Sequence, residues 1–238
     1  MAFKFTHRNP DMQIDKARTA LVVTDLQNEF LQPATGTYYE MIEETLRARN
    51  VVGNLELLLK TAQELGYYII HSPHYYYPSD AQWSVPPGAI ADYLRSIGFC
   101  GRKDPWNEAF EWDLKDFKGQ RADFYEPFKK YLMDGHTCNC SPHKHMGTAA
   151  NDVVKQLHMR NVKKLIMAGP AGNICLESHM RDLIEAGFEI AMVRDAAGAI
   201  SSEEGDGYAG QMNIWRYLAN ALWTTEETLA KMKAAATA

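Results

Sequence analysis

The 238-residue sequence predicts an α/β fold of three layers, in which helices cover both faces of a parallel sheet. Two observations lead to this prediction. Short apolar runs, several of them β-branched, recur along the chain at residues 19–25, 67–71, 164–169 and 188–193. The last three runs each follow a stretch of helical periodicity, at residues 41–65, 151–159 and 175–185. Strands that alternate with helices pair in parallel, and their continuous apolarity indicates burial on both faces.

The ends of these elements carry the expected stop and start signals. Gly66 and Gly187 each follow a helical stretch, and glycine ends helices because it adopts the left-handed conformation without steric cost. Residues 211–233 predict a helix, then a short apolar run at residues 221–223, then a last helix. That last helix is expected to begin at a capping box, Thr224-Thr-Glu-Glu.

Residues 78–145 interrupt the alternation of strands and helices. The segment is too long for a simple connection, and it is rich in tryptophan and proline. We expect an irregular insertion with one further strand near residues 137–140, inside a single domain that spans residues 1–238. Its aromatic side chains either fix the loop to the core or line a pocket.

Composition and charge narrow the class of protein. The net charge of −5 and the pI near 5.9, without any basic run, argue against nucleic acid as a partner. No apolar stretch is long enough to span a bilayer, and the first residues lack the apolar centre of a signal peptide. Four cysteines are too few for a disulfide framework, so we expect reduced thiols. These features predict a cytoplasmic enzyme that acts on a small molecule, with no membrane partner.

The most informative segment is the turn that follows the apolar run at residues 164–169. It reads Ala168-Gly-Pro-Ala-Gly-Asn-Ile-Cys and places Cys175 where the next helix begins. A helix N-terminus favours a thiolate and offers backbone N–H groups to an oxyanion. Ligands of open α/β sheets bind at this edge, outside the carboxyl ends of the strands. Cys175 is therefore a candidate nucleophile, and the alternative is a small apolar core residue.

A carboxylate follows the first strand at the same edge of the sheet. Asp25 ends the apolar run at residues 19–25 and precedes Leu26-Gln-Asn-Glu-Phe. A carboxylate in that position can take the thiol proton of Cys175 and return it to a leaving amine. The alternative role is a helix cap or a turn residue, which is common for aspartate after a strand.

Three segments together resemble the isochorismatase-like cysteine hydrolases, a family that includes nicotinamidases and ureidoacrylate and N-carbamoyl amidohydrolases. They are residues 20–30 (ALVVTDLQNEF), 168–178 (AGPAGNICLES) and 192–197 (MVRDAA). The likeness covers most of the chain except residues 78–145. It implies a three-layer sandwich with a mostly parallel six-stranded sheet flanked by helices, and assembly into homo-oligomers.

The resemblance also implies a catalytic triad of aspartate, lysine and cysteine that works through an acyl-thioester intermediate. Asp25 and Cys175 match the first and last members directly. The family has a cis peptide in the turn before the cysteine, and here it falls between Pro170 and Ala171. That bond would direct the Ala171 N–H, together with the Cys175 N–H, at the oxyanion.

The lysine of this triad has no match at its expected place. Counting back without gaps from the helix at residues 151–159 puts it at Pro142, which can neither carry a positive charge nor donate a proton. Lys144 is the expected substitute, and His143 and His145 are the alternatives. A cation there lowers the pKa of the cysteine and helps to hold the oxyanion. If Lys144 instead lies in solvent, the site is rearranged or the family chemistry is lost.

Five further residues are candidates for substrate binding because of their position near this edge of the sheet. They are Gln27, Phe30, His74, Tyr76 and Asn173. A glutamine there could orient the catalytic carboxylate, and a phenylalanine could stack on a planar substrate. For each of the five, ordinary packing or turn formation is the alternative.

Residues 136–145 contain three histidines and two cysteines, which are side chains that bind zinc. The Cys-x-Cys spacing is not that of a zinc knuckle, however, and no second ligand pair follows. Some nicotinamidases bind a metal through Asp and His near the second strand, and residues 71–77 do not reproduce that pattern. We therefore expect no bound metal and no cofactor.

We predict a cysteine-dependent hydrolase that cleaves a linear C–N bond, in an amide, ureide or carbamoyl group, of a small polar molecule. One alternative is a vinyl-ether hydrolase of the isochorismatase type, which can act without the cysteine. Another is a non-catalytic binding protein that retains the fold. A nucleotide-binding protein is not favoured, because no glycine-rich phosphate loop follows any strand.

Overall fold

A six-stranded sheet forms the centre of the computed structural model, which describes residues 11–77, 80, 83, 88–89 and 118–237. The strands, in chain order, are β1 (Thr19–Thr24), β2 (Tyr68–Ser72), β3 (Cys138–Asn139), β4 (Lys164–Gly169), β5 (Glu189–Ala197) and β6 (Ala221–Trp223). They are arranged β3-β2-β1-β4-β5-β6, and every neighbouring pair is parallel. The predicted α/β class is confirmed, with a sheet that is parallel throughout.

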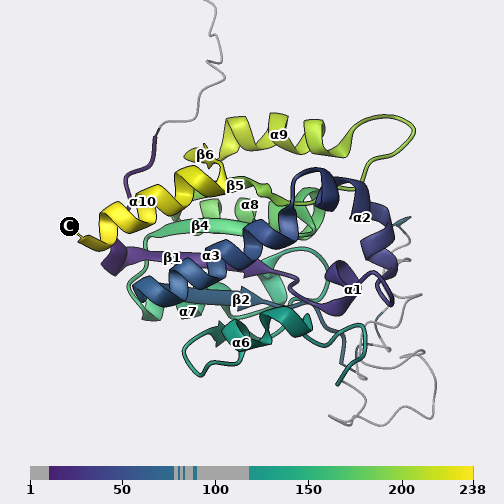
Figure 1. Ribbon diagram of the computed structural model, residues 1–238, viewed down its shortest axis with the longest axis horizontal. Coiled ribbons are helices and arrows are strands. Elements are labelled where there is room, and N and C mark those ends of the chain that lie inside the picture. Colours follow the sequence, from purple (N-terminus) through teal and green to yellow (C-terminus); the bar gives the residue numbers. More distant parts are fainter. Residues whose placement is uncertain (1–10, 78–79, 81–82, 84–87, 90–117, 238) are drawn as a thin grey trace, which may run out of the picture.

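Helices cover both faces of this sheet (Figure 1). On one face lie α2 (Thr37–Ala48), α3 (Val51–Leu65) and α10 (Thr225–Thr237). On the other lie α7 (Val153–Met159), α8 (Glu177–Glu185) and α9 (Gly207–Leu218). Each layer has its own apolar cluster against the sheet, and all six residues of β1 are buried between them. This explains why β1 reads as a continuous apolar run.

Short elements connect the layers and the strand ends. They are α1 (Asn28–Leu31), α6 (Lys129–Leu132), a π-helical turn (Gly172–Leu176) and 3₁₀ turns at Lys16–Arg18, Glu126–Phe128 and Thr148–Ala150. Of the predicted insertion at residues 78–145, the described part contains α6 and β3. Most of the rest, including Trp106 and Trp112, lies outside the described residues. No helix within the described ranges combines the length and the hydropathy needed to cross a membrane.

The sequence predicted the start of the last helix correctly but did not predict a break within residues 41–65. The stretch at residues 41–65 is two helices, because Asn50 adopts a left-handed conformation (φ 51°) between α2 and α3. The capping box before α10 is confirmed in both directions. The backbone N–H of Thr224 donates to Glu227 Oε2 at 2.7 Å, and the N–H of Glu227 donates to Thr224 Oγ1 at 3.2 Å.

The strand order places a topological switch point at the carboxyl ends of β1 and β4. The chain goes from β1 to β2 on one side and returns to β4 on the other side, so the connections leave β1 in opposite directions. Such a switch point is where open α/β sheets bind ligands. The residues that follow β1 and β4 are the ones that contain Asp25 and Cys175.

Candidate active site

Asp25 follows β1 directly and lies in the interior of the protein. Its backbone N–H donates to the carbonyl of Ser72 at 3.1 Å, which continues the pairing of β1 with β2 by one residue. Its φ is 59°, in the left-handed region, which aspartate tolerates better than most residues. The side chain is completely buried. The bend that ends β1 therefore places this buried carboxylate at the carboxyl edge of the sheet.

Cys175 lies in the π-helical turn Gly172–Leu176, between β4 and α8. The Ala171 carbonyl accepts from the N–H groups of Ile174 and Leu176, and the Gly172 N–H donates to the Gly198 carbonyl at 3.0 Å. A Cβ on Gly172 would lie 2.2 Å from that same carbonyl oxygen, so only glycine fits the close approach. The thiol is almost fully buried. The predicted position of Cys175 at the start of a helix is confirmed.

The peptide bond between Pro170 and Ala171 is trans, as are all peptide bonds of the described residues. The expectation of a cis bond in this turn is therefore wrong. A cis bond that precedes a residue other than proline costs about 3 to 4 kcal/mol, and the turn closes without it through the hydrogen bonds of the Ala171 carbonyl and the Gly172 N–H.

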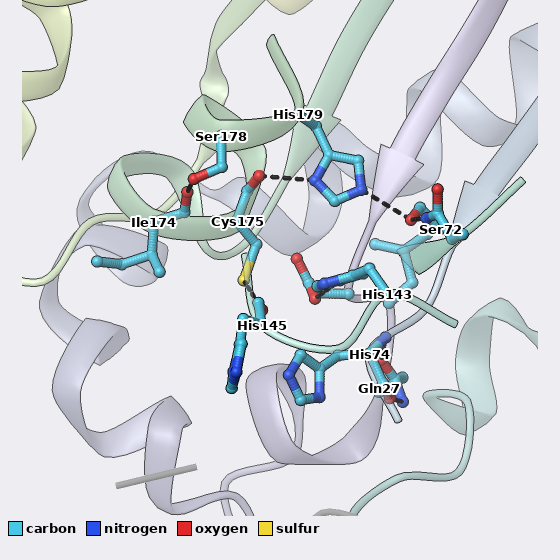
Figure 2. Close-up of polar contacts among 12 residues, drawn as sticks. Gln27, Ser72, His74, His143, His145, Ile174, Cys175, Ser178 and His179 are labelled. Carbon is cyan, nitrogen blue, oxygen red and sulfur yellow. Dashed lines mark hydrogen bonds and ion pairs between the residues drawn. The ribbon is translucent and has the colours of Figure 1, made fainter. Parts of the chain in front are cut away.

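The structure brings a histidine to the pair. Nε2 of His143 lies 2.9 Å from Oδ1 of Asp25, and both side chains are fully buried. The ligand-type atoms of Asp25, His143 and Cys175 all lie within 4.8 Å of one another. Figure 2 shows the Cys175 thiol and the side chain of His143 near one another. The three side chains thus form one buried cluster, which we call the Asp–His–Cys site.

The ammonium of Lys144, which the sequence predicted as the cation of this site, lies elsewhere. It contacts Oδ2 of Asp80 at 2.5 Å and lies 3.6 Å from the centre of the Tyr77 ring. The reason is local geometry, because the chain around His143 forms a parallel β-bridge with His74. Successive side chains of extended backbone point to opposite sides, so a chain that directs residue 143 at Asp25 directs residue 144 away from it.

Burial and the neighbouring carboxylate determine the protonation of the thiol. Burial raises the pKa of Cys175 well above its usual range, and the negative charge of Asp25 and a hydrogen bond to its carboxylate raise it further. The backbone N–H of Cys175 acts in the opposite sense and lowers the pKa. The resting side chain is therefore a thiol that has the carboxylate of Asp25 beside it as a proton acceptor.

Three more buried histidines surround His143. The ring of His74 lies edge-on at 4.9 Å between centroids, and the ring of His179 lies edge-on at 4.8 Å on the other side. Burial lowers the pKa of His71 and of His179 to about 4. Burial, followed by the charges of His143, His145 and Lys144, also lowers the pKa of His74. These three rings are neutral near pH 7, and two of them, His74 and His179, pack against His143.

The hydrogen bonds of His179 define its tautomer (Figure 2). The carbonyl of Cys175 can only accept, so Nδ1 of the neutral ring carries the proton and donates to it at 2.8 Å. Nε2 therefore accepts from the Ser72 hydroxyl at 2.8 Å, and Asn151 donates to the same hydroxyl at 2.7 Å. This chain of hydrogen bonds links the end of β2 to the backbone of the nucleophile. His179 was not among the predicted site residues, although a residue four positions after Cys175 is expected to face the same side of a helix.

Of the five predicted substrate-binding residues, two lie beside the Asp–His–Cys site. His74 packs against His143, and the Tyr76 hydroxyl shares a hydrogen bond of 2.8 Å with Nδ1 of His145. The His145 carbonyl in turn is 3.9 Å from the Cys175 sulfur. Tyr76 and His145 also contact the ring of Trp83, which is 40% exposed. These aromatic side chains lead from the buried thiol towards the surface.

The other three candidates have structural contacts. Gln27 holds the loops together, because its amide donates to the carbonyls of His74 and Ala122 and accepts from the His74 N–H, each at 2.7 Å. The amide of Asn173 is paired with both backbone groups of Ile200. Phe30 is fully buried against Tyr38, with 4.7 Å between ring centroids. These three residues therefore fix the positions of the loops around the site, and we assign them no direct contact with a substrate.

Comparison with known proteins gives a consistent result. The family model described as Isochorismatase domain matches residues 19–227. The structure is similar to that of a cysteine hydrolase from Pseudomonas syringae pv. phaseolicola 1448A, with a TM-score of 0.69 and 20% identity over 97% of this chain and 100% of that one. It is similar to an isochorismatase family protein from Burkholderia thailandensis, with a TM-score of 0.56 and 18% identity over 94% and 99%. It is also similar to N-carbamoylsarcosine amidase from Thermoplasma acidophilum, with a TM-score of 0.56 and 17% identity over 88% and 97%.

Proposed function

The chain belongs to the isochorismatase family, and from this premise we propose that it is an amidohydrolase in which Cys175 attacks the carbonyl of an amide, ureide or carbamoyl group in a small polar molecule. The observation that carries the proposal is the Asp–His–Cys site itself. A buried thiol, a carboxylate that can accept its proton and an imidazole that holds the carboxylate are the parts that nucleophilic catalysis requires.

In the first half of the reaction the thiol adds to the substrate carbonyl. Asp25 takes the thiol proton as the C–S bond forms, because its carboxylate is the group hydrogen-bonded to the thiol. The tetrahedral intermediate then collapses, the C–N bond breaks, and Asp25 gives the proton to the leaving ammonia or amine. This leaves an acyl-thioester on Cys175.

In the second half water hydrolyses the thioester. Asp25 accepts a proton from the attacking water, and the sulfur leaves as the C–S bond breaks and recovers a proton. The backbone N–H groups of Ala171 and Cys175 are our candidates for holding the oxyanion. Both groups belong to the turn that carries the nucleophile. The Ala171 carbonyl closes this turn by accepting hydrogen bonds, and the Cys175 N–H lies close enough to its own sulfur to lower the pKa of the thiol.

His143 takes the position that we had expected a lysine to occupy. By donating from Nε2 to Oδ1 of Asp25 it fixes the carboxylate beside the thiol. Lys144 is assigned a different role. Its ion pair with Asp80, packed on Tyr77, fixes the chain that carries His143 and His145.

Cleavage of a C–N bond is favoured by the chemistry of the site and by one structural likeness. A carboxylate that first receives and then returns a proton is suited to a leaving amine, which must be protonated to depart. The similar fold of N-carbamoylsarcosine amidase is in line with this choice. The aromatic edges of Tyr76, His145 and Trp83 favour a small planar substrate.

A screen for ammonia release over small amides, ureides and carbamoyl compounds tests the proposal, with the Cys175→Ser protein as the matched control. We expect at least one compound that the unchanged protein hydrolyses and the variant does not. With that compound, intact-mass measurement during turnover should show the protein plus one acyl group. Equal ammonia release by the two proteins would contradict the proposal, because the thiol would then not be the nucleophile.

A further inference from the structure

The Asp–His–Cys site has the donor set of a transition-metal centre. It offers one carboxylate, one imidazole and one thiol, from the end of β1, the chain after β3 and the turn before α8. Zinc binds this combination of sulfur, nitrogen and oxygen ligands, whereas magnesium and calcium prefer sites made of oxygen ligands alone. We propose that Asp25, His143 and Cys175 bind a zinc-like divalent cation, and that the bound cation reversibly blocks the nucleophile.

The distances among the three donors are close to those of a tetrahedral site. Ligands that lie about 2.0 to 2.3 Å from zinc are about 3.3 to 3.8 Å from one another. The three donor atoms here lie within 4.8 Å of one another, and Oδ1 of Asp25 is 2.9 Å from Nε2 of His143. A cation between them therefore requires small side-chain shifts and no rearrangement of the strands.

Two atoms of the site have unused hydrogen-bonding capacity. Oδ2 of Asp25 and Nδ1 of His143 are buried, and neither has a nitrogen or oxygen partner among the described residues. Oδ2 is thus available as a ligand. Nε2 must lose its proton before its lone pair can bind a cation. Nδ1 can take up that proton, so the ring stays neutral.

Charge balance favours the bound state. On binding, the thiol of Cys175 loses its proton to solvent, and the proton of His143 moves from Nε2 to Nδ1. The cation with charge +2 then faces a thiolate and a carboxylate, each with charge −1, and a neutral imidazole. The result is a buried cluster without net charge, and one proton is released for each cation bound.

The inhibitory consequence rests on the proposed function, whereas the binding itself does not. A thiolate whose lone pair is held by a cation cannot add to a carbonyl, so the metal-bound protein is inactive. Removal of the cation by a chelator returns the thiol and the activity.

The binding is tested with Co²⁺, whose thiolate complexes absorb in the near ultraviolet and whose four-coordinate complexes absorb strongly in the visible. We expect one Co²⁺ per chain with a thiolate band, displacement by Zn²⁺, and release of about one proton per Co²⁺. The Cys175→Ser protein should lose the thiolate band, and His143→Gln should weaken binding at least about 10-fold. Circular dichroism checks that both variants fold.

The matched control is the double variant Cys138→Ser, Cys140→Ser, which removes the two other cysteines of the described residues. It should keep the thiolate band. Loss of the band in this control, or its survival in Cys175→Ser, would overturn the assignment. A chelator-treated protein that hydrolyses its substrate but binds no Co²⁺ refutes the metal site alone. A protein that binds Co²⁺ as expected but has no hydrolytic activity when metal-free refutes only the proposed function.

Discussion

The two sides of the Asp–His–Cys site are built in different ways. Asp25 and Cys175 follow β1 and β4, which pair with each other over five residue pairs in the centre of the sheet. His143 follows β3, an edge strand that pairs with β2 through two residue pairs, and it is held by one further β-bridge and by contacts between rings. The nucleophile and its base are thus placed by a regular ladder, and their partner is placed by an irregular segment.

This difference suggests a division of roles. The central strands place the nucleophile and the proton acceptor, for which no other side chain can substitute. The irregular segment supplies a hydrogen-bond donor that positions the carboxylate, and more than one type of side chain can do this. Substitutions on the β1 and β4 side should therefore cost more activity than substitutions on the β3 side.

The largest expected effect is at Cys175. Changing it to alanine removes the nucleophile, and turnover of the compound found in the ammonia screen should fall by about 10⁴-fold or more. The melting temperature should change little, since a small apolar side chain replaces a buried thiol, which is itself a small side chain and only a weak hydrogen-bond donor. Substantial residual turnover would show that Cys175 is not the nucleophile. The proposed difference in roles between the β1 and β4 side and the β3 side of the site would then also be wrong.

The next effect is at Asp25, where Asp25→Asn should lower kcat by about 10² to 10⁴-fold. The same change should make the thiol more acidic, because the charge of Asp25 raises the pKa of Cys175. The pH midpoint of Cys175 alkylation by iodoacetamide should therefore move to lower pH in this variant. A midpoint that moves upwards, or does not move, would show that Asp25 is not the carboxylate that faces the thiol.

The same comparison explains what the sequence could and could not predict. Asp25 and Cys175 were found because long buried strands show in the sequence as apolar runs and because parallel strand ends meet at one edge. Lys144 was expected where His143 lies, because a two-residue strand has no periodicity that defines which of two neighbours points inward. The cis bond before Ala171 was implied only by the family resemblance, and the chain has the trans bond that is ordinary before a residue other than proline. Asn50 is of a residue type that tolerates the left-handed region, but such a residue can equally lie inside a helix, so the pattern alone did not divide residues 41–65.

The buried histidines around His143 predict a dependence of stability on pH. The pKa of His71 and of His179 is about 4 in the folded protein, and the ordinary value is 6.5. Between these values the unfolded chain binds protons that the folded protein excludes, so the free energy of unfolding falls as the pH falls from 6.5 towards 4. Each histidine contributes a loss of up to about 3 kcal/mol over that range.

Urea unfolding at pH 7, 6 and 5 measures this loss, and His179→Gln provides the comparison. The variant should be less stable at pH 7, because the hydrogen bonds to Ser72 and to the Cys175 carbonyl are perturbed. Its stability should nevertheless depend less steeply on pH. If the unchanged protein is equally stable at pH 7 and pH 5, the histidines are not buried in their neutral form.

The central claim is that His143, and not its neighbour, completes the site with Asp25 and Cys175. The most direct test compares kcat/KM of His143→Ala and Lys144→Ala on the same substrate, with both proteins checked for folding. We expect His143→Ala to lose about 10²-fold or more, mainly in kcat, because it removes the group bonded to the catalytic carboxylate. Lys144→Ala should lose less than about 10-fold, since its ammonium faces Asp80. The reverse order of losses would contradict the account.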